Sequence, residues 1–496
     1  MSSIITYNDL HKLSLFVEHN MALHFPEKRW NDLERNIKKA ANEFGYSDIT
    51  DFIDNITASP LSQVDAEILA SHLTINETFF WREPKTFEAL ERVIIPELLN
   101  RKKYSKKSIR IWSAGCSGGE EPYSIAIALK RFVPDIKNWD IEILATDISP
   151  LMLKKAESGV YGKWSFRGTP SWLKQSYFSE VSPNKFKINT DIKKMVSFDF
   201  LNLADNKYPS LINNTNAIDI IYCRNVLMYF NQERFKKVVK GFYNSLVEGG
   251  YLIVSANELS YQNFTDFETI NIPEFVLYKK NTKTKHSSYE PPKTIDYNGF
   301  TDIKEEIANV NEPVEFSKTV SDIIKKEKEK NKTKVINNDD VKSMFLSGNY
   351  HDVIKVLNDR DKTPETYILQ IESLANIGEI DSASKACEEA ISKNKLDYKL
   401  HFLNATISQN QNKYSEAVSS LQKAIFINPD FILAYYSLAN NMIKNENIKG
   451  AIKNYNNALS IMSKLDDEEI VEESEGLTVG RLKELINSSI RKNALK

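Results

Sequence analysis

The feature that most constrains this chain lies between Ile109 and Ser124, where the sequence reads Ile-Arg-Ile-Trp-Ser-Ala-Gly-Cys-Ser-Gly-Gly-Glu-Glu-Pro-Tyr-Ser. A short apolar strand runs into three glycines, and good helix formers continue after Pro122. Glycine permits positive φ and a close approach of backbone to a ligand, and proline suits the first turn of a helix. The run therefore predicts the first strand, loop and helix of a doubly wound sheet, where nucleotide-like ligands bind.

Two acids at the start of this helix restrict the ligand. Glu120 and Glu121 would repel phosphate, the group that a helix N-terminus otherwise attracts. The run also lacks the Gly-x-Gly-x-x-Gly spacing of dinucleotide sites and the Gly-Lys-Ser/Thr ending of P-loops. These features favour a nucleoside ligand with positive charge, and S-adenosylmethionine is such a molecule. One alternative stays open, in which the glycines only close a tight turn and the acids cap the helix dipole.

Composition excludes several classes of protein. The 496 residues carry a formal net charge of −2, so no global basic field indicates a nucleic-acid partner or an anionic membrane surface. The three cysteines lie far apart and show neither metal-ligand spacing nor a disulfide pattern, so no metal is expected. No signal peptide and no membrane-spanning run is evident. We expect a soluble, cytoplasmic protein without membrane insertion.

Periodicity divides the first part of the chain in two. Residues 1–80 repeat apolar side chains at helical spacing and predict a small helical domain. Strands and helices alternate over residues 81–280, which predicts an α/β domain with a parallel sheet and an irregular aromatic-rich insertion at residues 162–194. The expected strands are 109–112, 141–146, 195–198, 218–222, 251–255 and 275–279.

The remainder of the chain has a different character. Residues 281–338 are rich in Lys, Glu, Asn, Thr and Ser and predict a flexible linker. Over residues 339–463 small side chains recur with a period of 34, as at Ala383, Ala417 and Ala451. This period is typical of tetratricopeptide repeats, each a helix-turn-helix unit. Residues 464–496 predict an acidic hinge and a last helix that caps the stack.

Polar side chains follow three of the expected strands. Asp147 closes the second strand, and Asn202 and Asn225 follow two later ones. An acid at the end of the second strand of such a fold can accept hydrogen bonds from ribose hydroxyls. The alternatives are helix capping by Asp147 and turn formation by the asparagines. Their common place at the carboxyl edge of one sheet favours a binding site.

A second candidate segment precedes the sheet. Residues 74–84 read Thr-Ile-Asn-Glu-Thr-Phe-Phe-Trp-Arg-Glu-Pro, with three adjacent aromatic side chains. Such a segment could cover a ligand, and Arg82 could offer its forked guanidinium to a carboxylate. The alternative is a packed interdomain connection in which Arg82 pairs with a nearby acid.

Four motifs in order carry a resemblance to a known family. They are Asn76-x-Thr78-x3-Arg82-Glu83, the glycine-rich run 113–124, Thr146-Asp147-Ile148, and Cys-Arg-Asn-Val-Leu-Met-Tyr-Phe at 223–230. Together they resemble the CheR-type chemotaxis receptor methyltransferases over residues 10–280, in particular the subgroup with C-terminal tetratricopeptide repeats. The resemblance implies a class I methyltransferase sheet and S-adenosylmethionine as cofactor. It also implies methyl-ester formation on glutamates of the cytoplasmic helices of chemoreceptors.

The resemblance further implies which residues form the site. Arg82 and Tyr229 would border the reacting methyl group. The sequence does not distinguish Glu120 from Glu121, and we favour Glu120. The implied cofactor contacts are Asn76, Thr78, Arg82, Ala114, Gly115, Glu120, Asp147, Asn202, Leu203, Asn225 and Val226.

The chain departs from the family pattern in two places. Arg35, Lys38 and Lys39 are expected to meet an acidic receptor helix, but Ala-Ala-Asn follows where the family presents more basic residues. Residues 179–185 contain no glycine, whereas some members hold a receptor tail peptide with a glycine-rich loop there, so we expect no such tethering. We expect the repeats to bind a protein partner whose identity the sequence does not give.

Two other functions remain open from the sequence. The enzyme could methylate a different acceptor, although the balanced charge argues against nucleic acid. Alternatively, the chain could be a non-catalytic scaffold whose sheet only binds the cofactor.

Overall fold

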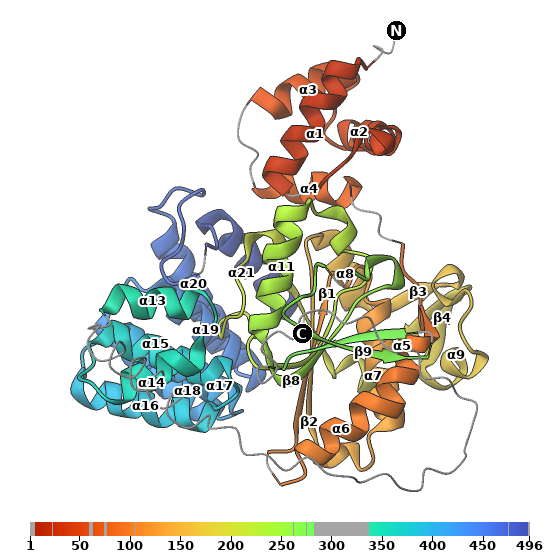
Figure 1. Ribbon diagram of the computed structural model, residues 1–496. Coiled ribbons are helices and arrows are strands. Elements are labelled where there is room, and N and C mark those ends of the chain that lie inside the picture. Colours follow the sequence, from red (N-terminus) through yellow and green to blue (C-terminus); the bar gives the residue numbers. More distant parts are fainter. Residues whose placement is uncertain are drawn as a thin grey trace, which may run out of the picture.

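The structure is a computed structural model that describes residues 5–21, 23–58, 63–73, 77–104, 106–260, 262–273, 275–281, 337–474 and 476–494. In Figure 1 a group of N-terminal helices lies above a central sheet, and a stack of helices lies beside it. The predicted linker at 281–338 falls outside the described residues except at its two ends.

The N-terminal part is helical, as predicted. Its helices bury one apolar stripe each, with Leu13, Val17, Leu33 and Ile37 fully inaccessible to solvent. Gly45 follows the second long helix at a φ of +81°, a conformation that suits glycine after a helix end. The helices are α1 (Tyr7–Met21), α2 (Trp30–Glu43), α3 (Ile49–Ala58) and α4 (Gln63–Leu73), with a short η1 (Glu27–Arg29) before α2.

Seven strands form the central sheet, in the order β6-β2-β1-β7-β8-β10-β9. The first five strands of this order are parallel, and β10 is antiparallel to both of its neighbours. All six predicted strands are present. The bounds are β1 (Ser108–Ala114), β2 (Asp140–Asp147), β6 (Val196–Phe200), β7 (Ile218–Tyr222), β8 (Leu246–Ile253), β9 (Glu268–Ile272) and β10 (Phe275–Lys279).

The sheet is buried on both faces. Along β1 the side chains of Ile109 and Ile111 enter one core, and those of Trp112 and Ala114 enter the other. The first core contains the helices before β1 and after it, and the second contains α11 (Gln232–Ser245). The helices of the first core are α5 (Pro84–Ala89), η2 (Leu90–Ile94), α6 (Ile95–Arg101) and α7 (Glu120–Phe132), and α8 (Pro150–Ser158) follows β2.

Two parts of this domain differ from the prediction. β9 lies at the sheet edge and is only half-buried, so its apolar pattern is too weak to predict a strand. The insertion, expected to be irregular, contains a three-stranded antiparallel sheet in the order β3-β5-β4. Its strands are short and its aromatic side chains pack on Phe80, so they look like loop residues in the sequence. The elements are β3 (Val160–Gly162), η4 (Lys163–Phe166), α9 (Ser171–Tyr177), β4 (Phe178–Ser182), β5 (Lys185–Ile188) and α10 (Thr190–Lys193).

The C-terminal part is a stack of antiparallel helix pairs. Ala383, Ala417 and Ala451 occupy equivalent places in the second helix of three successive pairs and are almost fully buried, which lets the paired helices approach closely. An additional pair precedes these three, and a last helix packs on α20. The stack therefore has the tetratricopeptide architecture. Its helices are α13 (Asn338–Leu346), α14 (Tyr350–Asn358), α15 (Pro364–Asn376), α16 (Ile380–Lys393), α17 (Tyr398–Asn410), α18 (Tyr414–Ile427), α19 (Ile432–Lys444), α20 (Ile448–Met462) and α21 (Val479–Ala494).

The repeats dock on the sheet domain through a loop before β7. Leu211 is 5% exposed and belongs to the apolar cluster of α15, α16 and α17. Asn216 Nδ2 donates to the carbonyl of Ala375 over 3.2 Å. Arg481 of α21 lies over the Phe200 ring at the end of β6. We call residues 208–216 the docking loop.

Within the described part of the chain, no helix is both long and apolar enough to cross a membrane.

A buried carboxylate connects β7 to the chain entering β1, and its removal should destabilise the sheet. Asp219 accepts hydrogen bonds from Arg101 Nη2 at 3.1 Å, from Lys102 Nζ and from the backbone N–H of Arg110 at 3.0 Å. Burial lowers the pKa of Lys102, and the adjacent Asp219 opposes that effect. Asp219→Ala would leave these donors without their acceptor, so we expect a loss of about 3 kcal/mol in the free energy of unfolding.

Urea denaturation followed by tryptophan fluorescence measures this loss for the transition of the sheet domain. The matched control is Glu233→Ala, which removes an exposed partner of Lys237 and should cost under about 0.5 kcal/mol. Equal shifts for the two variants would contradict the role given to Asp219.

Candidate active site

A cavity of about 320 Å³ opens at the carboxyl ends of the parallel strands. This volume lies at the lower end of the range of roughly 300–1,000 Å³ for small-molecule sites. Its walls come from seven stretches of chain that are distant in sequence. The lining residues are Met21, Leu23, Glu77, Thr78, Phe79, Arg82, Phe87, Gly115, Cys116, Ser117, Glu121, Ser124, Asp147, Ile148, Leu201, Asn202, Leu203, Arg224, Asn225, Val226, Met228, Tyr229, Phe230 and Asn257.

The floor of the cavity is the glycine-rich loop after β1. Gly115 has a φ of +83°, and its N–H donates to the carbonyl of Thr146 over 2.8 Å. A Cβ at Gly115 would stand 2.4 Å from Cγ2 of Val226, so the walls from β1 and β7 meet because this residue has no side chain. The loop thus has the conformation and the bare backbone that its sequence predicted.

Asp147, at the end of β2, fixes this loop to the neighbouring strand. One carboxylate oxygen accepts the N–H of Ser117 at 2.8 Å, and the other accepts the N–H of Ser149 at 2.9 Å. Burial raises the pKa of Asp147, and these backbone donors oppose the rise. Each oxygen has a further lone pair, so the carboxylate can still accept hydrogen bonds from a hydroxyl pair in the cavity.

The two acids at the start of α7 point in different directions. Glu120 is fully buried outside the cavity, where it pairs with Lys155 at 3.1 Å and accepts from Ser165 Oγ at 2.9 Å. Glu121 is the acid that lines the cavity, and it accepts from Ser113 Oγ at 2.7 Å. Successive helical residues are about 100° apart around the axis, so only one of the two can face the ligand. Glu120, which we favoured from the sequence, is therefore replaced by Glu121 as the residue at the cavity.

Arg224, after β7, connects three parts of the wall. Its guanidinium lies 3.2 Å from carboxylate oxygens of both Glu121 and Glu83 and donates to the carbonyl of Arg82 over 2.8 Å. Only 3% of its side chain is exposed, so the two carboxylates balance a charge that water does not reach. Burial raises the pKa of Glu121, and Arg224 opposes that rise.

The chain around Arg82 is held in an uncommon conformation. Trp81 and Glu83 have positive φ values of 59° and 56°, which side-chain-bearing residues seldom adopt. The N–H of Trp81 donates to Ser124 Oγ over 3.0 Å, and its ring stacks on Phe87. Such strain persists only where the surroundings determine it strongly, and it is common at functional sites. The geometry directs Arg82 to the cavity wall.

Glu258, which the sequence analysis did not single out, holds the wall after β7. It lies 6% exposed and accepts the N–H groups of Asn225 and Met228 at 2.8 and 3.3 Å and the hydroxyl of Ser255 at 2.6 Å. Asn225 itself has a φ of 60°. The Ser-x-x-Glu spacing at 255–258 is a capping-box signal that could have identified this residue.

The N-terminal helices form part of the cavity roof. The N–H of His24 donates to the carbonyl of Tyr229 over 2.7 Å, and Arg29 lies over the Tyr229 ring at 5.3 Å. Met21 and Leu23 line the cavity from this side. Neither was a candidate from the sequence, because apolar residues at a helix end look like core.

The other candidate residues fall into three groups. Thr78, Arg82, Gly115, Asp147, Asn202, Leu203, Asn225, Val226 and Tyr229 come together around the cavity. Ala114 is buried in the core beside it, and Asn76 lies outside the described residues. Arg35, Lys38 and Lys39 lie on α2 and do not line the cavity, and the first two pair with Asp32 and Glu34 of their own helix.

This set of side chains fits S-adenosylmethionine. Asp147 offers lone pairs for ribose hydroxyls, Glu121 places negative charge in the wall, and Leu203, Val226 and Phe230 provide apolar surface for a flat base. An acid in the first turn of α7 suits a positively charged ligand and not a phosphate. Fold and cavity together define a methyltransferase of the class that uses S-adenosylmethionine.

Comparisons with known proteins agree. Residues 76–276 match the family described as CheR methyltransferase, SAM binding domain. A chemotaxis protein methyltransferase of Borreliella burgdorferi is 34% identical over 256 residues, which cover 51% of this chain and 89% of that protein. The chemotaxis protein methyltransferase Cher2 of Pseudomonas putida is 30% identical over 255 residues, or 50% of this chain and 90% of that protein. The chain therefore belongs to the CheR family of methyltransferases, and its cofactor is S-adenosylmethionine.

Among solved structures, the crystal structure of a MamA protein is similar to 25% of this chain and 71% of its own, at 22% identity and a TM-score of 0.24. Such a low score carries no weight, so the repeat architecture rests on the helices of this chain.

Removal of the carboxylate that fixes the glycine loop should weaken cofactor binding. We expect Asp147→Ala to reduce affinity for S-adenosylmethionine by about 100-fold, because both the hydroxyl acceptor and the support of the Ser117 N–H are lost. Isothermal titration calorimetry measures the affinity, and Asp266→Ala, at an exposed position, is the control. Unchanged affinity in Asp147→Ala would remove this residue from the cofactor site.

Proposed function

We propose that this protein forms methyl esters on glutamate side chains of the cytoplasmic helices of chemoreceptors. The observation that carries the proposal is the convergence of Arg82 and Tyr229 on the same cavity as Asp147 and Glu121. Arg82 and Tyr229 are suited to an incoming carboxylate, and Asp147 and Glu121 are suited to the cofactor. The names of the similar methyltransferases place them in chemotaxis, which supports a receptor as the substrate. Its place of action would be the cytoplasm.

The chemistry requires little from the side chains beyond alignment. When bound, S-adenosylmethionine supplies a methyl group whose carbon–sulfur bond breaks as a carbon–oxygen bond to the glutamate forms. The glutamate carboxylate is already ionised at neutral pH, so no residue has to remove a proton. The protein has to hold the carboxylate in line and keep water away from it.

Arg82 and Tyr229 are suited to these tasks. Arg82 Nη1 donates to the carbonyl of Glu77 over 2.9 Å, which leaves other guanidinium donors for a carboxylate. Tyr229 is half-buried beneath Arg29, and its hydroxyl can act as a further donor. Met21 and Leu23 would exclude water from the same side.

The surface of α2 is the proposed contact with the receptor helix. Arg35, Lys38 and Lys39 would face acidic residues of the substrate. Because Arg35 and Lys38 already pair with Asp32 and Glu34 at 2.7 and 2.6 Å, their attraction for a substrate would be reduced. This surface would therefore align the receptor more than it would hold it tightly.

The direct test uses purified protein, methyl-labelled S-adenosylmethionine and membranes that contain the organism's own chemoreceptors. We expect label on bands of receptor size, released as methanol by mild base, since esters are labile to base. Base-stable label would contradict ester formation and indicate another acceptor atom. Cofactor binding without any transfer would favour the non-catalytic scaffold.

Arg82→Ala should separate catalysis from stability. We expect the rate of methyl transfer to fall by about 100-fold or more, because the variant loses the charged donor for the carboxylate. The urea midpoint should change little, since the Arg82 side chain is partly exposed and it is the backbone carbonyl that binds Arg224. Arg92→Ala, on the exposed face of η2, is the control. A normal rate in Arg82→Ala would remove Arg82 from the mechanism.

We further propose that the repeats at 339–463 localise or regulate the enzyme. Deletion of residues 340–496 should then change receptor methylation or enzyme localisation in cells. The deletion exposes Leu211, so the variant should also carry Leu211→Asn to keep the loop polar. Unchanged methylation and localisation would contradict this role.

A further inference from the structure

The repeat stack contains a groove that the enzyme itself fills at one end. We define the repeat groove by α13, α15 and α17. At its filled end, Leu211 and its neighbours of the docking loop enclose a cavity of about 110 Å³ against Phe345, Ile368 and Phe402. Leu211 is buried beside Ile371 and Leu403. This end of the groove is therefore closed by the sheet domain.

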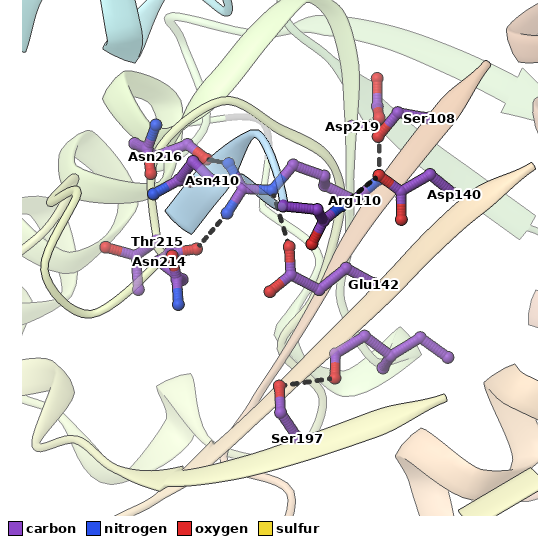
Figure 2. A network of polar contacts seen from close by, with 12 residues as sticks. Ser108, Arg110, Asp140, Glu142, Ser197, Asn214, Thr215, Asn216, Asp219 and Asn410 are labelled. Atoms are coloured by element: carbon purple, nitrogen blue, oxygen red, sulfur yellow. Dashed lines mark hydrogen bonds and ion pairs between the residues drawn. The ribbon is translucent and has the colours of Figure 1, made fainter. Parts of the chain in front are cut away.

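The docking loop is firmly held on the sheet side. Arg110 of β1 donates from Nη1 to the carbonyl of Asn216 over 2.8 Å and from Nη2 to the carbonyl of Asn214 over 3.0 Å, as Figure 2 shows. Its Nε also lies 3.3 Å from a carboxylate oxygen of Glu142. The docking loop is thus anchored to the sheet through Arg110, and its Leu211 side chain packs among the repeat helices.

The other end of the repeat groove is open and basic. A hollow of about 960 Å³ continues from the filled end, and Ile368, Lys399 and Glu473 line both. Lys342, Lys393, Lys395 and Lys399 line the open end together with Leu396, which is 82% exposed. Three acids, Glu365, Asp397 and Glu473, also line it, so the lysines exceed the acids by one. Asp397 accepts the N–H groups of Lys399 and Leu400, and Lys393 pairs with Glu389 at 2.9 Å. The wall thus combines positive charge with apolar surface.

An acidic part of the same chain already occupies one edge of this open end. Lys399 Nζ pairs with Glu472 at 3.2 Å and with Glu473 at 2.5 Å, and Tyr398 Oη donates to Glu472 over 2.6 Å. Between 36% and 51% of each of these charged side chains is exposed, so the ion pairs are weak and displaceable. These internal contacts indicate that the wall of the open end binds carboxylate side chains.

We propose that the open end of the repeat groove binds an extended acidic segment of a protein partner, which displaces Glu472 and Glu473 from Lys399. The acids of the partner would face the lysines, and an apolar side chain would cover Leu396. The proposal does not depend on which acceptor the enzyme methylates.

Binding of a partner in the groove should change the affinity of the cofactor cavity for its ligand, and the docking loop should carry this effect. A ligand at the open end would contact Ile368 and Lys399, which also enclose Leu211. At the near end of the same segment, Tyr208 Oη donates to the carbonyl of Leu203 over 2.9 Å, and Leu203 lines the cofactor cavity. Two binding sites that bias one segment are coupled reciprocally.

The first experiment measures binding of a fluorescent peptide with the sequence of residues 466–474, Asp-Asp-Glu-Glu-Ile-Val-Glu-Glu-Ser, to the full chain by anisotropy. The double variant Glu472→Gln, Glu473→Gln should bind it about fivefold more tightly, because the internal competitor loses its charge. Lys399→Glu should weaken binding about tenfold. Lys413→Glu, on the same stack but outside the groove, should match the unaltered protein.

Three results would overturn the assignment. Equal binding by Lys399→Glu would show that the peptide does not use this wall. Equal binding of a peptide with Gln and Asn in place of its acids would show that charge is not recognised. Tighter binding of a random RNA oligonucleotide than of the peptide would assign the groove to a nucleic acid instead.

A second measurement tests the coupling without any methyl transfer. Saturating peptide should change the affinity for S-adenosylmethionine by about fivefold in the unaltered protein. Leu211→Ala should abolish that change, whereas Leu151→Ala, at a side chain of α8 that is 59% exposed and lines neither the groove nor the cofactor cavity, should keep it. An affinity that the peptide does not alter in the unaltered protein would refute the coupling.

Discussion

The active site depends on one buried charge. Arg224 lies within 3.2 Å of both Glu121 and Glu83 and also holds the carbonyl of Arg82, so it connects α7, the strained segment before α5 and the end of β7. A guanidinium can make these contacts at once because its donors form a rigid planar fork, which an ammonium lacks. Loss of Arg224 would leave Glu121, whose side chain is only 14% exposed, without its counter-charge, so the guanidinium keeps the three segments in one arrangement.

Some residues of the site could be predicted from the sequence, and others could not. Gly115, Asp147 and Asn225 follow buried parallel strands, and parallel strands deliver their carboxyl ends to a single edge. The choice between Glu120 and Glu121 depends instead on helix rotation. Lys155 and Ser165, from the next helix and from the insertion, bind Glu120 outside the cavity, and Glu121 is the acid that lines it. No local pattern around α7 contains that information.

The fold was predictable to a similar degree. Long periodic features, namely the N-terminal helices, the parallel strands and the repeat of 34 residues, came from the sequence because each buries a regular apolar face. The sheet of the insertion could not be predicted, because its strands are short. Its aromatic side chains also pack between different elements and do not form a regular apolar face on a single strand. The interface between repeats and sheet also could not be predicted, since Leu211 in isolation resembles any other loop residue. Its burial comes from helices that begin far along the chain.

The sequence separation between the docking loop and the repeat helices has a consequence for folding during synthesis on the ribosome. The hydrogen bond from Asn216 to Ala375 joins residues 159 positions apart. At a synthesis rate of about 5–20 residues per second, roughly 10–30 s pass between the emergence of the loop and that of its partner helices. During this interval β1, β2, β6 and β7, all of which end before residue 223, can pair while Leu211 has no cover. The docking loop is therefore the part of the sheet domain that acquires its packing last, once the repeats have been made.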